Sequence, residues 1–208
     1  MRPTRPWILA VAVFLAALLA GCGSGTTKTY ANKDFQFSVS YDAAKLTQSV
    51  DAANSGAMTF NAPGKPPVPA NVILVDVTAK PAKDSYTAWQ GPGGVQVSAA
   101  KTARPISPPT LAEVRQESKK DFLGMPGLTL KSAQGRLKGL AVGQWQPFTL
   151  DGLHGYTISY TTNTTHQVVY DLYNGRYHYG FVVGASKSAW SGIAPTLNAV
   201  VQSFHVTQ

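Results

Sequence analysis

Few side chains of this 208-residue chain have the types and spacing that catalysis requires. The best match to a catalytic motif is the S-x-x-K spacing of Ser98 and Lys101. In serine enzymes with this motif the two residues lie one turn apart on a helix, so that the amine helps to deprotonate the hydroxyl. Here Val95, Val97 and Ala99 alternate with polar residues as in a strand, which directs Ser98 and Lys101 to opposite faces. The companion motifs S-D-N and K-T-G are absent from the chain, and we therefore expect no enzyme of this kind.

The four histidines offer one pair that could interact. No two of them have the i, i+4 spacing of a helical metal site; they are His154, His166, His178 and His205. A turn at Asn174-Gly175 would place Asp171 opposite His178 on two paired strands. A surface salt bridge is the plain interpretation of this pair. A divalent-metal site is the alternative, but the sequence does not identify its third ligand, and we assign neither a metal nor a cofactor to the chain.

Tyr173 and Arg176 lie beside this pair, near the tip of the same predicted hairpin. Tyrosine and arginine are enriched among the residues that contribute most to binding at interfaces. Asp171, Tyr173, Arg176 and His178 therefore form our candidate binding patch. The alternative is that Tyr173 and Arg176 only decorate an exposed hairpin.

The strands that would carry this patch have a clear apolar face. With the turn at Asn174-Gly175, one face of the hairpin carries Val168, Tyr170, Leu172, Tyr177, Tyr179, Phe181 and Val183. We expect Tyr156, Ile158 and Tyr160 to continue this core face on the preceding strand, which follows another hairpin turn at Asp151-Gly152. The opposite face of the hairpin is mostly polar and includes the candidate patch.

The earlier segments predict further strands and a long loop. Alternating apolar residues predict a half-buried strand at 35–41 and a short strand at 57–61. The four prolines in 62–70 require a loop, and 72–77 is apolar enough for a strand covered on both faces. We expect 129–140 to be extended.

Two helices are predicted around these strands. Thr110 and Glu113 form a capping-box pattern, and their helix should run to about residue 123, before Gly124. Ser188 can cap a second helix with an apolar side, in which Pro195 should introduce a kink or start a new helix. Strands followed by covering helices predict a single domain of the α+β class with an antiparallel sheet.

The first 21 residues have the pattern of an export signal. Arg2 and Arg5 precede a run of 14 residues without a polar side chain, 7–20, which is shorter than the ~20 apolar residues of a spanning helix. The run ends in Leu19-Ala20-Gly21-Cys22, which resembles the lipobox of bacterial lipoproteins, where the cysteine thiol is lipidated and becomes the new N-terminus. We therefore predict lipidation of Cys22, the only cysteine, and attachment to the membrane through it. An ordinary signal peptide or an uncleaved anchor is the alternative.

Removal of residues 1–21 would change the length and the net charge of the chain. It leaves 187 residues and lowers the formal net charge from +8 to +6. Residues 22–29 would then be the lipidated cysteine and a flexible tether, and 30–208 a single domain of ordinary size. Export makes nucleic acid an unexpected partner, and the basic residues are too scattered to identify another one.

The two ends of the mature chain resemble the PsbP-like fold, which extrinsic proteins of photosystem II share with the Mog-type Ran-binding proteins. The matching segments are the opening strand 35–41, the run 152–160, the aromatic hairpin 168–183 and the closing helix through 197–204. Small lipoproteins of this general shape, including the mycobacterial LpqN family, occur on actinobacterial surfaces. The resemblance implies a central antiparallel sheet sandwiched by helices, with a third helix near 84–90. Residues 62–110 match no part of it.

Members of this fold are typically binding or assembly proteins without catalysis, which is an inference from fold alone. We therefore expect a non-enzymatic lipoprotein, anchored on the extracytoplasmic face of the cell membrane, that binds another envelope protein. A carrier or sensor of a lipid or small ligand, held between helix and sheet, is the alternative, and an envelope hydrolase ranks third. The resemblance transfers no ligand-binding residue to this chain.

Overall fold

A computed structural model describes residues 26–51, 70–76, 93–101, 105, 107–120 and 129–207. The predicted signal peptide, Cys22 and the first part of the tether precede the described residues. The predicted strand at 57–61, the proline-rich loop up to residue 69 and the predicted helix at 84–90 also lie outside them.

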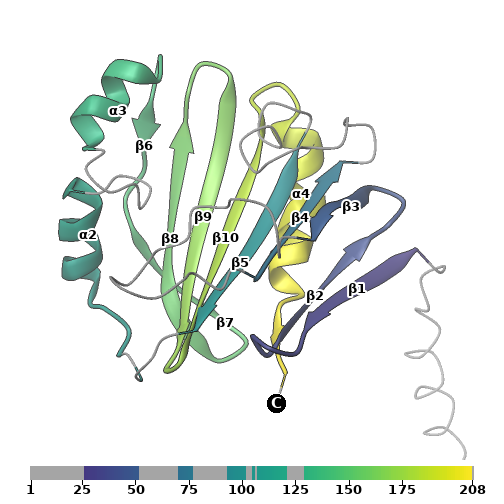
Figure 1. The fold of residues 1–208 in the computed structure, drawn as a ribbon. Helices are drawn as coiled ribbons and strands as arrows, with labels where there is room; N and C mark the ends of the chain where they lie inside the picture. The colour runs from purple at the N-terminus through teal and green to yellow at the C-terminus, as the bar shows by residue number, and fades with distance from the viewer. Residues whose placement is uncertain are drawn as a thin grey trace, which may run out of the picture.

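An eight-stranded antiparallel sheet forms the centre of the molecule (Figure 1). Its strands lie in the order β3 (Leu46–Asp51), β4 (Ala70–Asp76), β5 (Gly94–Lys101), β10 (Tyr177–Ser186), β9 (Thr165–Asn174), β8 (Leu153–Thr161) and β6 (Ala141–Val142). β7 (Gln146–Leu150) also pairs with β8. The consecutive strands β8, β9 and β10 form a meander, as the turn signals of the sequence predict, and the strand expected at 72–77 is β4.

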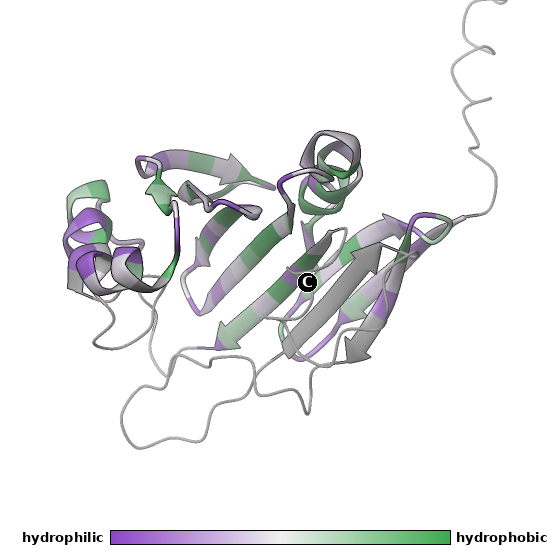
Figure 2. Ribbon diagram, turned by 90° about the horizontal axis from the view of Figure 1, so that it is seen from above, coloured by the Kyte–Doolittle hydropathy of each residue, from purple (hydrophilic) through white to green (hydrophobic). Residues whose placement is uncertain are grey.

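A smaller sheet and helices cover the two faces of this central sheet. β1 (Thr27–Asn32), β2 (Phe37–Asp42) and β11 (His205–Val206) form a separate three-stranded sheet, which the sequence did not lead us to expect. It packs with α4 (Trp190–Gln202) against one face. α2 (Leu111–Lys120) and α3 (Leu130–Arg136) contribute to a cluster on the other face, and Figure 2 shows the two groups of helices on different sides of the sheet. The fold is therefore α+β, with a central antiparallel sheet between covering elements.

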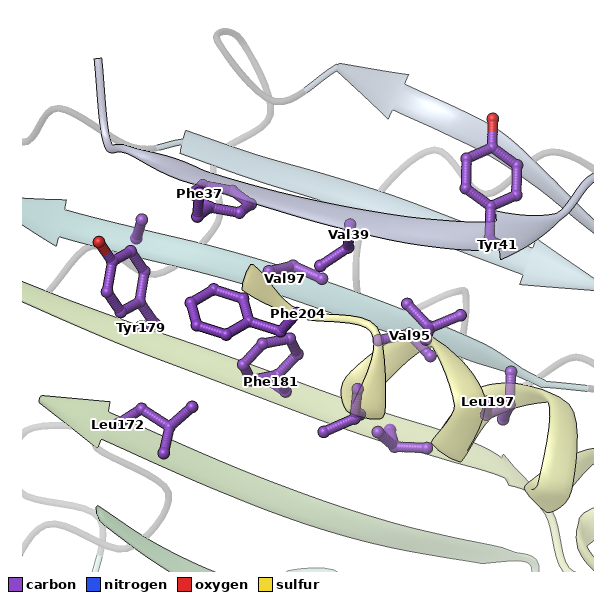
Figure 3. Packing of buried hydrophobic residues seen from close by; sticks show 14 of the residues in the cluster. Phe37, Val39, Tyr41, Val95, Val97, Leu172, Tyr179, Phe181, Leu197 and Phe204 are labelled. Atoms are coloured by element: carbon purple, nitrogen blue, oxygen red, sulfur yellow. The ribbon is translucent and has the colours of Figure 1, made fainter. Parts of the chain in front are cut away.

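The main hydrophobic core lies between the central sheet, β2 and α4 (Figure 3). Phe204, just beyond α4, lies at its centre with ring centroids 5.0 Å from Tyr179, 5.3 Å from Phe181 and 6.0 Å from Phe37. Tyr179 is fully buried, and its hydroxyl donates a hydrogen bond of 2.9 Å to the Phe35 carbonyl. Aromatic rings thus join the small sheet, α4 and the central sheet into one domain.

The predicted strand at 35–41 and the predicted turn at Asp151-Gly152 are both confirmed. Phe37, Val39 and Tyr41 of β2 are buried, and the residues between them are half-buried. Asp151 and Gly152 both have positive φ, 49° and 76°, between the paired ends of β7 and β8. Positive φ at both central residues is what a type I′ hairpin turn requires.

The β9–β10 hairpin has the predicted faces but a different register. Its turn consists of Gly175 and Arg176, so that His178 lies opposite Tyr173 and Asp171 lies opposite Gly180. Our placement of the turn at Asn174-Gly175 was wrong because it required positive φ at two residues. In the structure only Gly175, with φ 47°, has positive φ within the turn. The pairing is therefore shifted by two residues relative to the prediction. An even shift keeps each residue on its predicted face. The residues predicted to face inward are buried or half-buried.

The predicted orientation of β8 is wrong. Thr157 lies opposite Tyr170 and Ile158 opposite Val169, so Tyr156, Ile158 and Tyr160 point away from α4. These three residues instead form a second apolar cluster on the other face, with Ala133 of α3 and Trp145. The sequence pattern shows only that alternate residues of β8 are apolar; the helices on the other face decide which core they join.

Of two local predictions for residues 110–140, one is confirmed and the other is wrong. The capping box is confirmed, since the Glu113 carboxylate accepts from the Thr110 amide at 2.6 Å and Thr110 Oγ1 accepts from the Glu113 amide at 3.3 Å. The segment 129–140 is not extended: it contains α3, which Thr129 caps by accepting from the Ser132 amide. Ala133 is buried among exposed and half-buried neighbours, so α3 has little apolar periodicity to reveal it.

The closing helix differs from expectation in its cap. α4 is continuous through Pro195, so no new helix starts there. Ser188 does not cap it, because the N-cap residue is Ala189, which makes no side-chain hydrogen bond. The predicted helix is otherwise confirmed, with Leu197, Val200 and Val201 buried.

Candidate functional site

The candidate patch lies on the face of the central sheet that carries α2 and α3. Asp171 and Tyr173 point to this face from β9 and His178 from β10. Ser98 of β5 and Gly180 of β10 belong to the same face and lie in one cross-strand row with Asp171. We call these five residues the Asp171 cluster.

A carboxylate, an imidazole and a phenol ring contact one another in this cluster. His178 Nε2 lies 3.0 Å from Asp171 Oδ1, and the two side chains are 24% and 23% exposed. The rings of Tyr173 and His178 stack with centroids 4.8 Å apart and an interplanar angle of 12°. The predicted contact between Asp171 and His178 therefore exists, but it forms diagonally across the strands rather than between directly opposite residues.

Sequence reasoning missed Gly180 and Ser98 as members of the site. An ideal Cβ at Gly180 would lie 2.8 Å from Ser98 Oγ and 3.8 Å from Asp171 Oδ1. Ser98 Oγ donates a hydrogen bond of 3.2 Å to the Gly180 carbonyl. The missing side chain lets the Ser98 hydroxyl approach β10, whereas Asp171 would be in ordinary van der Waals contact with a Cβ at this position. A glycine inside a strand signals such a close approach, and that signal was available in the sequence.

The tyrosines near Asp171 are held in the neutral phenol form. Burial raises the pKa of Tyr173, and the Asp171 carboxylate raises it further by opposing a phenolate. The same two causes, in the same order, raise the pKa of Tyr160 on β8. Both shifts make the phenolate form less accessible than it is in an exposed tyrosine, so action of these groups as bases is disfavoured.

Arg176 is brought near the cluster but is not buried in it. It occupies the second position of the β9–β10 turn, where it is exposed. Arg176 follows Gly175 in the turn that joins the two strands carrying Asp171, Tyr173 and His178. The four residues predicted from the sequence are thus neighbours on one hairpin.

The structure separates the two residues of the S-x-x-K spacing. Ser98 points to the face of the Asp171 cluster, whereas Lys101 lies on the α4 side with Nζ 5.6 Å from the ring centroid of Tyr177. The expectation that a strand would direct them to opposite faces is confirmed. Within the described part of the chain, no group of three or more His, Cys, Asp or Glu side chains could hold a metal ion.

A groove between α4 and β2 is the second feature that could bind something. It has a volume of about 430 Å³ and is open to solvent. One wall is α4, with Pro195, Thr196 and Ala199, and the other is the end of β2 with Asp42 and the following Lys45. The two walls are joined by Ser203, whose Oγ accepts from the Ser40 amide at 2.8 Å.

Comparisons with known proteins bear on the fold. No protein-family model matches the chain, and no curated protein matches it in sequence. The solution structure of cyanobacterial PsbP (CyanoP) from Synechocystis superposes with a TM-score of 0.54 at 15% identity, covering 89% of this chain and 95% of that one. LpqN of Mycobacterium tuberculosis, described as involved in cell envelope biogenesis, gives a TM-score of 0.40 at 11% identity, covering 90% and 88%. A protein from Bacteroides thetaiotaomicron gives 0.47 at 9% identity, covering 88% of this chain and 50% of that one.

The chain therefore has a PsbP-like fold of the α+β class, as the C-terminal pattern led us to expect. Among the helices that the structure describes, none is long and apolar enough to cross a membrane.

Proposed function

We propose that this protein is a non-enzymatic, membrane-anchored accessory protein of the cell envelope that binds another envelope protein. Its anchor is the lipid on Cys22, and its binding surface is the Asp171 cluster together with Arg176. The proposal rests on the lipobox-like sequence before Cys22, the PsbP-like fold and the geometry of the cluster.

The observation that carries the proposal is that the polar groups of the cluster bind one another. His178 Nε2 contacts the Asp171 carboxylate at 3.0 Å. The Ser98 hydroxyl donates a hydrogen bond of 3.2 Å to the Gly180 carbonyl. The imidazole and the Ser98 hydroxyl therefore have different partners, and the described residues show no hydrogen bond between the two. Such mutual bonding favours a preorganised recognition surface, because less side-chain freedom is lost on binding.

The carrier alternative receives no support from the core. The space between α4 and the central sheet is filled by Phe181, Leu197 and Phe204, which are 0–3% exposed (Figure 3). A ligand held between helix and sheet would have to displace these side chains, at a cost of several kcal/mol for each large one. We therefore retain the protein-binding proposal alone.

Capture of partners from detergent-solubilised membranes tests the binding surface. Tyr173→Ala removes the ring that stacks on His178, and Arg176→Glu reverses the charge of the turn. We expect either substitution to reduce recovery of the partner by at least about tenfold, as loss of an interface hot spot does. Lys138→Glu is the matched control, since Lys138 is an exposed basic residue of another loop.

The outcomes separate clearly if folding is checked by far-UV and near-UV circular dichroism. Loss of the partner in both folded variants, with retention in Lys138→Glu, supports the surface. An unchanged set of captured proteins in both folded variants overturns it.

A further inference from the structure

The chain enters the fold at the rim of the groove between α4 and β2. The Thr26 carbonyl accepts a hydrogen bond of 2.7 Å from the Ala43 amide, and Thr27 pairs with Asp42 at the end of β2. Thr27 also lines the groove. The N-terminal side of the described chain is therefore fixed beside the groove by backbone hydrogen bonds.

The length of chain before Thr26 limits how far the groove can be from a lipid anchor. Cys22 precedes Thr26 by four residues. An extended chain spans at most ~3.6 Å per residue, so the two residues are no more than about 14 Å apart. If Cys22 carries the anchor, which is part of the proposed function, the groove is held close to the bilayer.

The Asp171 cluster lies on the opposite side of the molecule. The groove belongs to the face of the central sheet covered by α4 and β2, whereas the cluster belongs to the face with α2 and α3. β1 lies at one side of the molecule and the pair α2–α3 at the other in both Figures 1 and 2. Asp42 and Phe37 lie at opposite ends of β2, about 17 Å apart along the strand, and Phe37 packs on Tyr179 near the Arg176 turn.

The groove has chemistry that suits lipid head groups. Lys45 at its rim has a side chain 61% exposed, and Lys28 on the neighbouring strand is also exposed. Asp42 lies 3.9 Å from Lys45 and offsets part of its charge. The hydroxyls of Thr27 and Thr196 add hydrogen-bond donors that a phosphate can accept.

We infer that the α4–β2 groove is the surface on which the anchored domain rests against the bilayer, with phospholipid head groups as its occupant. The Asp171 cluster then faces away from that bilayer. The partner of the cluster must in that case be a protein domain that stands clear of the membrane surface.

Energy transfer from single sites to the membrane tests this orientation. The full-length lipidated protein is inserted in vesicles of phosphatidylethanolamine and phosphatidylglycerol that contain a rhodamine-labelled lipid as acceptor. A donor dye is attached to an introduced thiol in Ala44→Cys, next to the groove, or, as the matched control, in Gln134→Cys of α3; both residues are exposed. Acylated Cys22 does not react with the dye, because its sulfur is then part of a thioether. We expect transfer from position 44 to exceed that from position 134 several-fold.

Each outcome has a distinct meaning when the intact mass is measured on the same sample. Acylated protein with stronger transfer from position 44 supports the inference. Acylated protein with equal transfer, or stronger transfer from position 134, overturns the inference and leaves the proposed function standing. Protein without acylation at Cys22 removes the anchor from the proposed function and overturns the inference with it.

Discussion

Gly155 of β8 allows two strands of the central sheet to approach closely. An ideal Cβ at Gly155 would lie 1.7 Å from the Asp171 carbonyl oxygen, which belongs to the backbone and cannot rotate away. We expect Gly155→Ala to lower the free energy of unfolding by about 3 kcal/mol or more, through displacement of β9. Because β9 carries Asp171 and Tyr173, the substitution should also disturb the Asp171 cluster.

Gly135→Ala is the control for this prediction. Gly135 lies in α3 with no atom within 4 Å of an added Cβ. Alanine there should stabilise the helix by up to about 1 kcal/mol. Urea unfolding of both variants measures the difference, and a Gly155→Ala protein as stable as the parent would contradict the close approach of the strands.

Asp151 joins the β7–β8 turn to the C-terminal strand. Its carboxylate accepts from the Val206 amide at 2.7 Å and lies 3.1 Å from His205 Nδ1. The Val206 amide holds the pKa of Asp151 below its ordinary value of 3.8; burial opposes this effect, and the contact with His205 lowers the pKa to a smaller extent. The resulting stabilisation is complete above the unfolded-state pKa and is lost as the pH falls through the lower folded-state pKa.

We therefore predict that Asp151→Asn weakens the dependence of stability on pH below about pH 4. Asparagine tolerates the positive φ of 49° at this position, so the turn is kept while the charge is removed. Asp34→Asn, at an exposed position in another turn, is the control. If urea midpoints of the Asp151→Asn protein fall with acid as steeply as those of the parent, the carboxylate does not contribute in this way.

At the scale of elements, Phe204 connects α4, β2 and β10. Its ring is 3% exposed and contacts Phe37, Tyr179 and Phe181. We expect Phe204→Ala to cost about 3–5 kcal/mol of stability, as for other buried phenylalanines. Leu137→Ala, at a leucine that is 37% exposed, should change stability by less than about 0.5 kcal/mol. Chemical denaturation of both proteins checks the prediction, and similar losses in the two would contradict this core.

The elements also show what a sequence can and cannot specify. Alternation of apolar residues identified the faces of β9 and β10 although the predicted pairing was wrong. The error in the pairing is two residues, and an even shift leaves the faces unchanged. The same alternation on β8 did not show which face of the sheet its apolar residues join, since both faces have a core. Among the side chains of α3 that the structure describes, only Ala133 is deeply buried, so the helix lacks the periodicity that revealed α2 and α4.

The candidate site was predictable in part for the same reason. Asp171, Tyr173 and His178 could be placed on one hairpin face, because strand parity alone determines it. Ser98 could not be added, since its neighbourhood depends on β5 pairing with β10, about eighty residues further along the chain. Local patterns do not encode such pairing.

At the scale of the whole molecule, the separate three-stranded sheet depends on the meeting of the two ends of the domain. Val206 pairs with Phe37, and Ser203 Oγ is bonded to both the amide and the carbonyl of Ser40. A strand of two residues, β11, gives no recognisable signal in a sequence. This closure places the N-terminal end of the described chain beside α4, on the face of the central sheet opposite the Asp171 cluster.

The intact mass of the protein purified from membranes tests the central proposal most directly. We predict a mature chain that begins at Cys22, with the 187 residues that follow signal removal and additional mass from a lipid on that cysteine. A chain that begins at another residue, or one with an unmodified Cys22, would contradict membrane anchoring through this residue.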